Sequence, residues 1–152
     1  MIRYHFVTQW FFRVPIERVW EVIVDSEHWS EWMRDFRRVT VRRLALSGEK
    51  VFDIEYRGDL PYSFRFTLTP TYVEAPYRME LDASGQLVGT GCWTLFPKEG
   101  GTCVTYVWNV GVTNPIFSLL ARLPFIKALT EHNHNATMAR AEQALRQQLE
   151  DS

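Results

Sequence analysis

The chain has 152 residues and a formal net charge of -1, with 46% hydrophobic and 23% charged residues. This composition excludes intrinsic disorder, two cysteines are too few for a disulfide scaffold, and a pI of 6.4 argues against nucleic-acid binding driven by bulk charge. The sequence contains neither a membrane-spanning apolar run nor a signal-peptide pattern, so we expect a cytoplasmic protein with a single domain over residues 1–152.

The first predicted elements are a strand and two short helices. Apolar side chains alternate along residues 2–13, which predicts a strand. Pro15 suits the first position of a helix. Four apolar residues would share one face of that helix: Ile16, Val19, Trp20 and Ile23. A second short helix carries Trp29 and Trp32, which we expect to hold both helices against a sheet.

Residues 38–112 are predicted to form strands joined by tight turns. Four glycine-containing turn signals divide this region: Ser47-Gly48, Gly58-Asp59, Ser84-Gly85 and Gly100-Gly101. Their close spacing favours antiparallel neighbours, because parallel strands need long crossovers. Residues 125–150 contain no Gly or Pro, which predicts one long helix of about 39 Å. We therefore expect an α+β domain in which this helix covers an antiparallel sheet.

Turn lengths predict how the strands pair. Turns at 58–60, 83–85 and 98–101 imply the following opposed residues: Phe52 and Phe66, Ile54 and Phe64, Tyr56 and Tyr62, Asp53 and Arg65, Leu81 and Leu87, Met79 and Gly89, Trp93 and Tyr106. This register separates Cys92 from Cys103 by more than a disulfide can span. It also leaves the inner face of the sheet without charged side chains, which is typical of an apolar ligand pocket.

The aromatic residues, 14% of the chain, suggest that this inner face borders a cavity. A curved sheet around one helix encloses more volume than the helix fills, and Gly89 and Gly91 remove side chains from the inner face. We expect a cavity here, with a collapsed aromatic core as the alternative, and a volume above about 300 Å³ would support a ligand role. The expected ligand-binding residues of this cavity are Phe52, Ile54, Tyr56, Phe64, Phe66, Tyr77, Met79, Gly91, Trp93, Tyr106, Trp108, Glu131, His134 and Met138.

Several segments resemble the START and birch-pollen-allergen superfamily, also called SRPBCC. They are Val14-Pro15 through Val19-Trp20, Asp25, Trp29 and Trp32, then Gly89-Thr-Gly-Cys-Trp93, Gly101-Thr102 and Val104-Thr-Tyr-Val-Trp108. The polyketide cyclase/dehydrase and coenzyme Q-binding-protein branches are most similar. The resemblance implies the helix-grip fold: a seven-stranded antiparallel sheet wrapped around the C-terminal helix, with two short helices between strands 1 and 2. Members bind lipids, sterols, quinones or polyketides in the cavity, and some catalyse cyclisation or dehydration.

His134 is the main titratable candidate for catalysis, beside Tyr106 and Tyr56. It faces the sheet if the inward helical stripe is Glu131, His134, Met138, Ala141, Leu145 and Leu149. The rival stripe is Phe125, Leu129, His132 and Ala136, which would bury His132 instead. The run from His132 to Asn135 does not predict a metal site, because ligands two apart point to different sides of a helix. We expect no cofactor.

Two groups of residues could lie at the cavity mouth: Arg42 and Arg43 on the second strand, and Phe117 and Leu120 before the long helix. The arginines could contact an acidic headgroup or anionic lipid, or could simply protect an edge strand. The apolar pair suggests transient membrane contact or dimerisation. The oligomeric state, monomer or homodimer, stays open.

Three functions follow as hypotheses. The first is a carrier or sequestering protein for a hydrophobic small molecule, such as a lipid, a quinone or a polyketide-like compound. The second is a polyketide cyclase, aromatase or dehydratase that uses the same cavity. The third is a protein-interaction module with a collapsed cavity.

Overall fold

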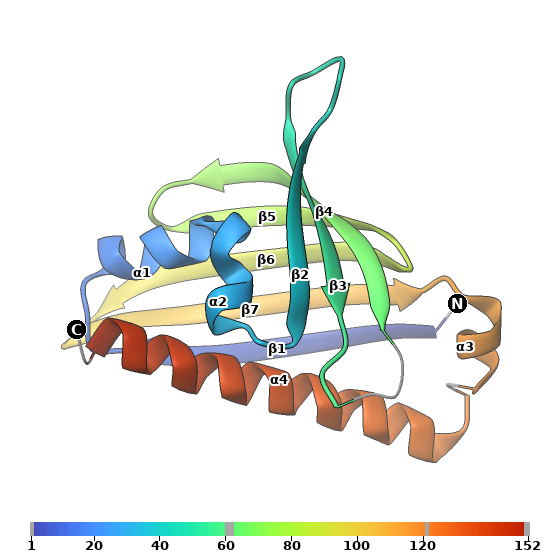
Figure 1. Cartoon of the computed structure of the whole chain (residues 1–152). Coiled ribbons are helices and arrows are strands. Elements are labelled where there is room, and N and C mark those ends of the chain that lie inside the picture. The colour runs from blue at the N-terminus through green and yellow to red at the C-terminus, as the bar shows by residue number, and fades with distance from the viewer. Residues whose placement is uncertain (1, 60–62, 121, 151–152) are drawn as a thin grey trace.

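Seven antiparallel strands form a single curved sheet that partly surrounds a long C-terminal helix (Figure 1). This computed structural model describes residues 2–59, 63–120 and 122–150, without the side chains of 116–118. The elements are β1 (Ile2–Phe12), α1 (Ile16–Val24), η1 (Ser26–His28), α2 (Trp29–Trp32), β2 (Phe36–Arg43), β3 (Lys50–Tyr56), β4 (Phe64–Glu74), β5 (Arg78–Gly85), β6 (Leu87–Lys98), β7 (Gly101–Val112), α3 (Pro115–Leu120) and α4 (Pro124–Glu150).

The strand order is β1-β7-β6-β5-β4-β3-β2, so the first two strands form the two edges of the sheet. The short helices α1 and α2 connect these edges, and α4 packs against β1 and α2 (Figure 1). This arrangement confirms the helix-grip fold. None of the described helices is long and apolar enough to cross a membrane.

The pairing of β6 with β7 agrees with the predicted register. Trp93 lies opposite Tyr106, and Cys92 lies opposite Val107. Cys103 lies opposite Phe96, as the same register predicts, and both cysteines are free thiols. The register is as predicted, although the turn itself is shorter: Lys98 pairs with Gly101, so two residues rather than four connect the strands.

Two other predicted registers are wrong, each by an even number of residues. Phe52 lies opposite Leu68, Ile54 opposite Phe66, and Tyr56 opposite Phe64. Asp53 therefore faces Thr67, and its ion pair is with Arg42. In the β5–β6 hairpin, Leu81 lies opposite Gly91 and Met79 lies opposite Trp93. Tyr62, the expected partner of Tyr56, lies outside the described residues. An even slip keeps every side chain on its predicted face, so the alternating pattern could not exclude it.

The two glycines of β6 serve different purposes. A Cβ on Gly89 would lie 1.9 Å from the backbone oxygen of Asn109 on β7, so the neighbouring strand, rather than a ligand, occupies this space. A Cβ on Gly91 would lie 3.1 Å from the Trp108 ring and 3.3 Å from the Tyr106 hydroxyl. Gly91 therefore gives two large aromatic side chains room on the inner face.

The two short helices pack on the sheet as predicted from their apolar spacing. The predicted face of α1 is buried: Ile16, Val19, Trp20 and Ile23. Trp29 and Trp32 are also buried, and the Trp29 indole donates a 3.0 Å hydrogen bond to the carbonyl of Ile23. Trp29 thus joins α2 to the end of α1.

The orientation of α4 decides between the two predicted stripes. Met138, Ala141, Leu145 and Leu149 are buried, whereas Phe125, Leu129 and His132 are exposed. The stripe that contains His134 therefore faces the sheet. All fully buried residues of α4 lie at position 133 or later, and in the first two turns Ile126 is the hydrophobic residue that packs, partly buried, against the core.

Candidate functional site

A pocket lies between the inner face of the sheet, α2 and the middle of α4. Its cavity volume is about 50 Å³, room for a few water molecules. The lining residues are Trp29, Met33, Phe36, Tyr56, Phe66, Leu68, Leu87, Trp93, Tyr106, Trp108, His134, Thr137 and Met138. In this conformation the cavity is therefore smaller than the volume of about 300 Å³ that would support a ligand role, because aromatic side chains occupy most of the space.

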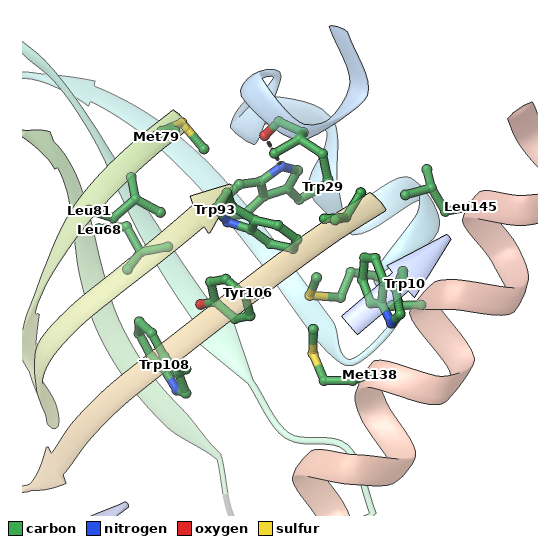
Figure 2. Packing of buried hydrophobic residues seen from close by; sticks show 14 of the residues in the cluster. Trp10, Trp29, Leu68, Met79, Leu81, Trp93, Tyr106, Trp108, Met138 and Leu145 are labelled. Atoms are coloured by element: carbon green, nitrogen blue, oxygen red, sulfur yellow. Dashed lines mark hydrogen bonds between the residues drawn. The ribbon is translucent and has the colours of Figure 1, made fainter. Parts of the chain in front are cut away.

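A stack of aromatic rings forms the sheet side of the pocket. The rings of Trp93 and Tyr106 stack with centroids 4.1 Å apart, and Trp108 lies 6.0 Å from Tyr106. These side chains come from the adjacent strands β6 and β7, while Met138 projects from α4 toward the sheet (Figure 2). Stacked rings on neighbouring strands present flat apolar surface to whatever enters the pocket.

Polar groups in the pocket are few and uncharged. None of the lining residues in the described chain is Asp, Glu, Lys or Arg. The Trp93 indole nitrogen and the His134 Nε2 atom are buried and have no hydrogen-bond partner. An unpaired buried donor or acceptor costs about 1–3 kcal/mol, so both atoms would gain from a polar group that came within hydrogen-bond distance of them.

His134 sits between the pocket and the first strand. Its ring stacks on Phe6 with centroids 3.8 Å apart. Burial lowers the pKa of His134 from 6.5 to about 4. The imidazole is therefore neutral near pH 7, where one ring nitrogen donates and the other accepts a hydrogen bond.

A buried polar cluster borders the pocket where α4 meets α2 and β3. The Thr137 hydroxyl donates a very short hydrogen bond to Asp35, and Arg140 contacts the same carboxylate oxygen at 2.5 Å. Arg140 also pairs with Asp59 at 3.1 Å. Asn133 accepts a 2.7 Å hydrogen bond from the Asp59 backbone amide. These contacts connect the middle of α4 to two separate segments, the one before β2 that holds Asp35 and the one after β3 that holds Asp59.

Tyr56 connects this cluster to the pocket. Its hydroxyl lies 3.0 Å from the Thr137 hydroxyl and accepts a 2.5 Å hydrogen bond from the Asn133 amide. Because the Asn133 amide donates to it and Thr137 donates to Asp35, Tyr56 is the donor in its bond to Thr137. Burial raises the pKa of Tyr56 to about 12, so it remains a neutral phenol. Burial also raises the pKa of Tyr106 well above its usual range.

Half of the expected lining residues reach the pocket: Tyr56, Phe66, Trp93, Tyr106, Trp108, His134 and Met138. Others lie in the surrounding core: Phe52, Ile54, Phe64 and Met79. Gly91 lies directly behind Trp108 and Tyr106. Tyr77 is not on the inner face, because it precedes β5 and is 49% exposed. Glu131 borders a separate surface hollow with Tyr4 and Phe6.

The residues expected at the mouth do not line this pocket. Arg42 lies on the outer face and forms an ion pair with Asp53, while Arg43 hydrogen-bonds the carbonyl of Gly48 near the tip of the β2–β3 hairpin. Figure 1 shows this hairpin extending away from α4. Leu120 is 48% exposed, and the side chain of Phe117 is outside the described part.

Sequence reasoning missed the polar cluster and part of the lining. Asn133, Thr137 and Asp35 are buried polar residues from distant parts of the chain, and no spacing pattern connects them. Met33 follows α2 in a connection that has no periodic pattern, and Phe36 is the first residue of β2. Leu68 could have been found, since it continues the alternation of Phe64 and Phe66.

Comparison with known protein families identifies the family of this chain. Residues 4–150 match the family described as polyketide cyclase / dehydrase and lipid transport. The chain belongs to this family. This match confirms the resemblance that was found in the sequence segments. The family description, polyketide cyclase / dehydrase and lipid transport, is the starting point for a functional hypothesis. No curated protein sequence matches the chain.

Solved structures with the same fold include an aromatase/cyclase and a START protein. The Zhui aromatase/cyclase from a Streptomyces species has a TM-score of 0.72 and 16% identity, with 96% of each chain covered. A START superfamily protein from Mycobacterium smegmatis has a TM-score of 0.70 and 12% identity, covering 98% of this chain and 97% of its own. The chain spans 50% of the di-domain ARO/CYC BexL, with 15% identity, 93% of this chain covered and a TM-score of 0.66. At these identities the similarities show the fold.

Proposed function

We propose that this protein binds a neutral, flat, apolar small molecule that carries a carbonyl or hydroxyl oxygen. The observation that carries the proposal is the aromatic, uncharged pocket with two buried polar atoms that lack partners. The Trp93 N–H can only donate, so it suits a carbonyl or hydroxyl oxygen. A charged ligand would lose its hydration without gaining an opposite charge in the pocket. Quinone-like and polyketide-like rings have the required shape and polarity.

Binding requires the pocket to enlarge, because about 50 Å³ is less than such a molecule occupies. The first two turns of α4 are the segment best suited to move. They contribute one partly buried hydrophobic side chain, Ile126, whereas the later turns are held by Met138, Ala141, Leu145 and Leu149. Displacing this segment costs little apolar burial. His134 is the first α4 residue that lines the pocket and follows this segment by three residues, so the pocket would enlarge if the movement extended to His134, whose Nε2 atom lacks a partner.

Tryptophan fluorescence provides a direct test, because three of the lining residues are tryptophans. We expect menadione and 1-naphthol, two flat neutral probes, to bind and to change this fluorescence saturably. Gly91→Val should weaken binding about tenfold or more, since the new side chain would push Trp108 and Tyr106 into the pocket. Cys92→Val, the adjacent position on the opposite face of β6, is the matched control and should bind normally.

His134→Phe keeps a ring against Phe6 but removes Nε2, and it should weaken binding of an oxygen-bearing probe about fivefold to tenfold. Circular dichroism confirms that each variant is folded. If neither probe binds the wild-type protein, the binding proposal is wrong and the interaction-module hypothesis is favoured. Equal losses for Gly91→Val and Cys92→Val would also contradict the proposed location.

A second candidate is proton transfer during cyclisation or dehydration, which the Tyr56 hydrogen-bond chain favours. A proton accepted by the Tyr56 oxygen can be balanced by transfer of its own proton to Thr137 and of the Thr137 proton to Asp35. In this proton relay, the Asp35 carboxylate would act as the base and the neutral Tyr56 phenol would pass the proton toward it through Thr137. The bound molecule would need an acidic C–H, such as the carbon between two carbonyl groups.

Deuterium exchange into 2-acetylcyclohexanone, followed by NMR, tests this candidate without knowledge of the natural substrate. We expect catalysed exchange in the wild-type protein and a loss of about 100-fold in Tyr56→Phe. Tyr77→Phe alters an exposed tyrosine and should leave the rate unchanged. Binding of the flat probes without any catalysed exchange would leave the carrier function and exclude this one.

A further inference from the structure

The junction of α3 and α4 exposes a group of large apolar side chains at one end of the molecule. The exposed fractions are 65% for Leu119, 48% for Leu120, 44% for Leu123, 66% for Phe125 and 41% for Leu129. We call these five residues the junction surface. Figure 1 shows α3 beside the N-terminal end of α4, so both helices contribute to the same end. Contiguous exposure of this kind marks an interaction site more often than scattered apolar residues do.

The backbone holds the junction surface in a defined shape. The amide of Arg122 donates to the carbonyl of Leu119, and the amide of Leu123 donates to the carbonyl of Leu120. The amide of Lys127 then donates to the carbonyl of Leu123, which joins the turn to the first turn of α4. Phe125 and Leu129 are four residues apart on α4 and therefore share one face.

The charged residues within the junction segment, residues 114–130, are both cationic. Residues 114–130 contain Arg122 and Lys127 but no Asp or Glu, although the chain has 18 acidic residues in total. Both cationic side chains are exposed, and neither forms an ion pair within the described chain. Glu131 directly follows this segment and borders the same surface hollow as Lys127, so the junction segment carries two positive charges, with one carboxylate beside Lys127 and none beside Arg122 in the segment.

We infer that the junction surface docks on an anionic lipid bilayer. Apolar side chains that enter the headgroup region and nearby cations that contact anionic lipids are the two contributions that hold an amphipathic segment on a membrane. No described helix could cross the bilayer, so the contact is at its surface. A second copy of the chain fits this surface poorly, because a twofold contact would bring Arg122 and Lys127 of both copies together. This inference goes beyond the proposed pocket function and does not depend on it.

Vesicle sedimentation tests the inference. We expect the protein to sediment with phosphatidylcholine vesicles that contain phosphatidylglycerol, and much less with phosphatidylcholine alone. Leu123→Glu combined with Phe125→Glu should lower the partition coefficient about tenfold or more. Leu46→Glu is the matched control, because Leu46 is 104% exposed at the tip of the β2–β3 hairpin, far from α3. Its partition coefficient should equal that of the wild type.

The charges have their own test. Arg122→Gln with Lys127→Gln should remove most of the preference for phosphatidylglycerol, and added salt should do the same to the wild-type protein. The inference is overturned if the wild type does not sediment with anionic vesicles, or if Leu46→Glu loses as much binding as the junction variant. It is also overturned if size-exclusion chromatography with light scattering shows a dimer that the junction variant dissociates.

Discussion

Asp35→Ala is expected to lower the free energy of unfolding by about 2–4 kcal/mol. Asp35 is buried and accepts hydrogen bonds from Thr137 and Arg140, both on α4. Removing its carboxylate leaves the buried Thr137 hydroxyl without an acceptor and separates the middle of α4 from the α2–β2 connection. Urea denaturation followed by tryptophan fluorescence measures the change.

Asp59→Ala is the matched control, because Asp59 pairs with the same arginine at 3.1 Å but its side chain is 68% exposed. Exposed ion pairs contribute little, so this variant should lose less than about 1 kcal/mol. Thr137→Val should lose an amount closer to that of Asp35→Ala. If the two aspartate variants are equally stable, the buried cluster does not hold α4 in place.

Acidification is expected to destabilise the fold through His134. Its pKa in the folded protein is about 4, below the ordinary 6.5, so the neutral ring is favoured by folding. Above pH 6.5 this contribution is fully present. Between pH 6.5 and pH 4 the unfolded chain binds a proton that the folded protein does not bind, and stability falls as the pH falls. The total loss should be about 2–3 kcal/mol and should level off below pH 4.

Urea denaturation at a series of pH values measures this effect. His134→Phe keeps the ring against Phe6 but cannot titrate, so its stability should fall less between pH 7 and pH 4 than that of the wild type, by about the same 2–3 kcal/mol. His132→Gln changes an exposed histidine on the other side of α4 and should leave the wild-type pH dependence unaltered. Identical pH profiles for the wild type and His134→Phe would contradict the buried, neutral state of His134.

The sequence was most informative where a period of two or of 3.6 residues decides which side of an element is buried. It correctly assigned the inner faces of β6 and β7, and it identified the stripe of α4 that turned out to face the sheet. It could not choose between that stripe and its rival, because both contain apolar residues. Only packing against β1 and α2 resolves this choice, and it leaves Phe125 and Leu129 on the surface.

The pocket also shows which features the sequence predicts and which depend on tertiary packing. Alternation predicted an aromatic inner face, but it contains no information on how far the rings of Trp93, Tyr106 and Trp108 fill the space between strands and helix. Side-chain packing in three dimensions sets the cavity volume, which is why the sequence could not predict it. The position of Tyr77 was wrong because the β4–β5 connection places it before the strand begins.

By itself, the sequence determined an α+β domain with an antiparallel sheet covered by the C-terminal helix, the face of each strand on which most of the aromatic residues lie, and the separation of the two cysteines, while the helix-grip fold followed from the family resemblance. Alternation and turn signals are local, and local patterns are sufficient for these features. Only the tertiary structure decided the β3–β4 and β5–β6 registers, since a slip of two or four residues preserves every face. It alone also brought Asp35, Tyr56 and Thr137 together, because hydrogen bonds between distant segments depend on the path of the whole chain.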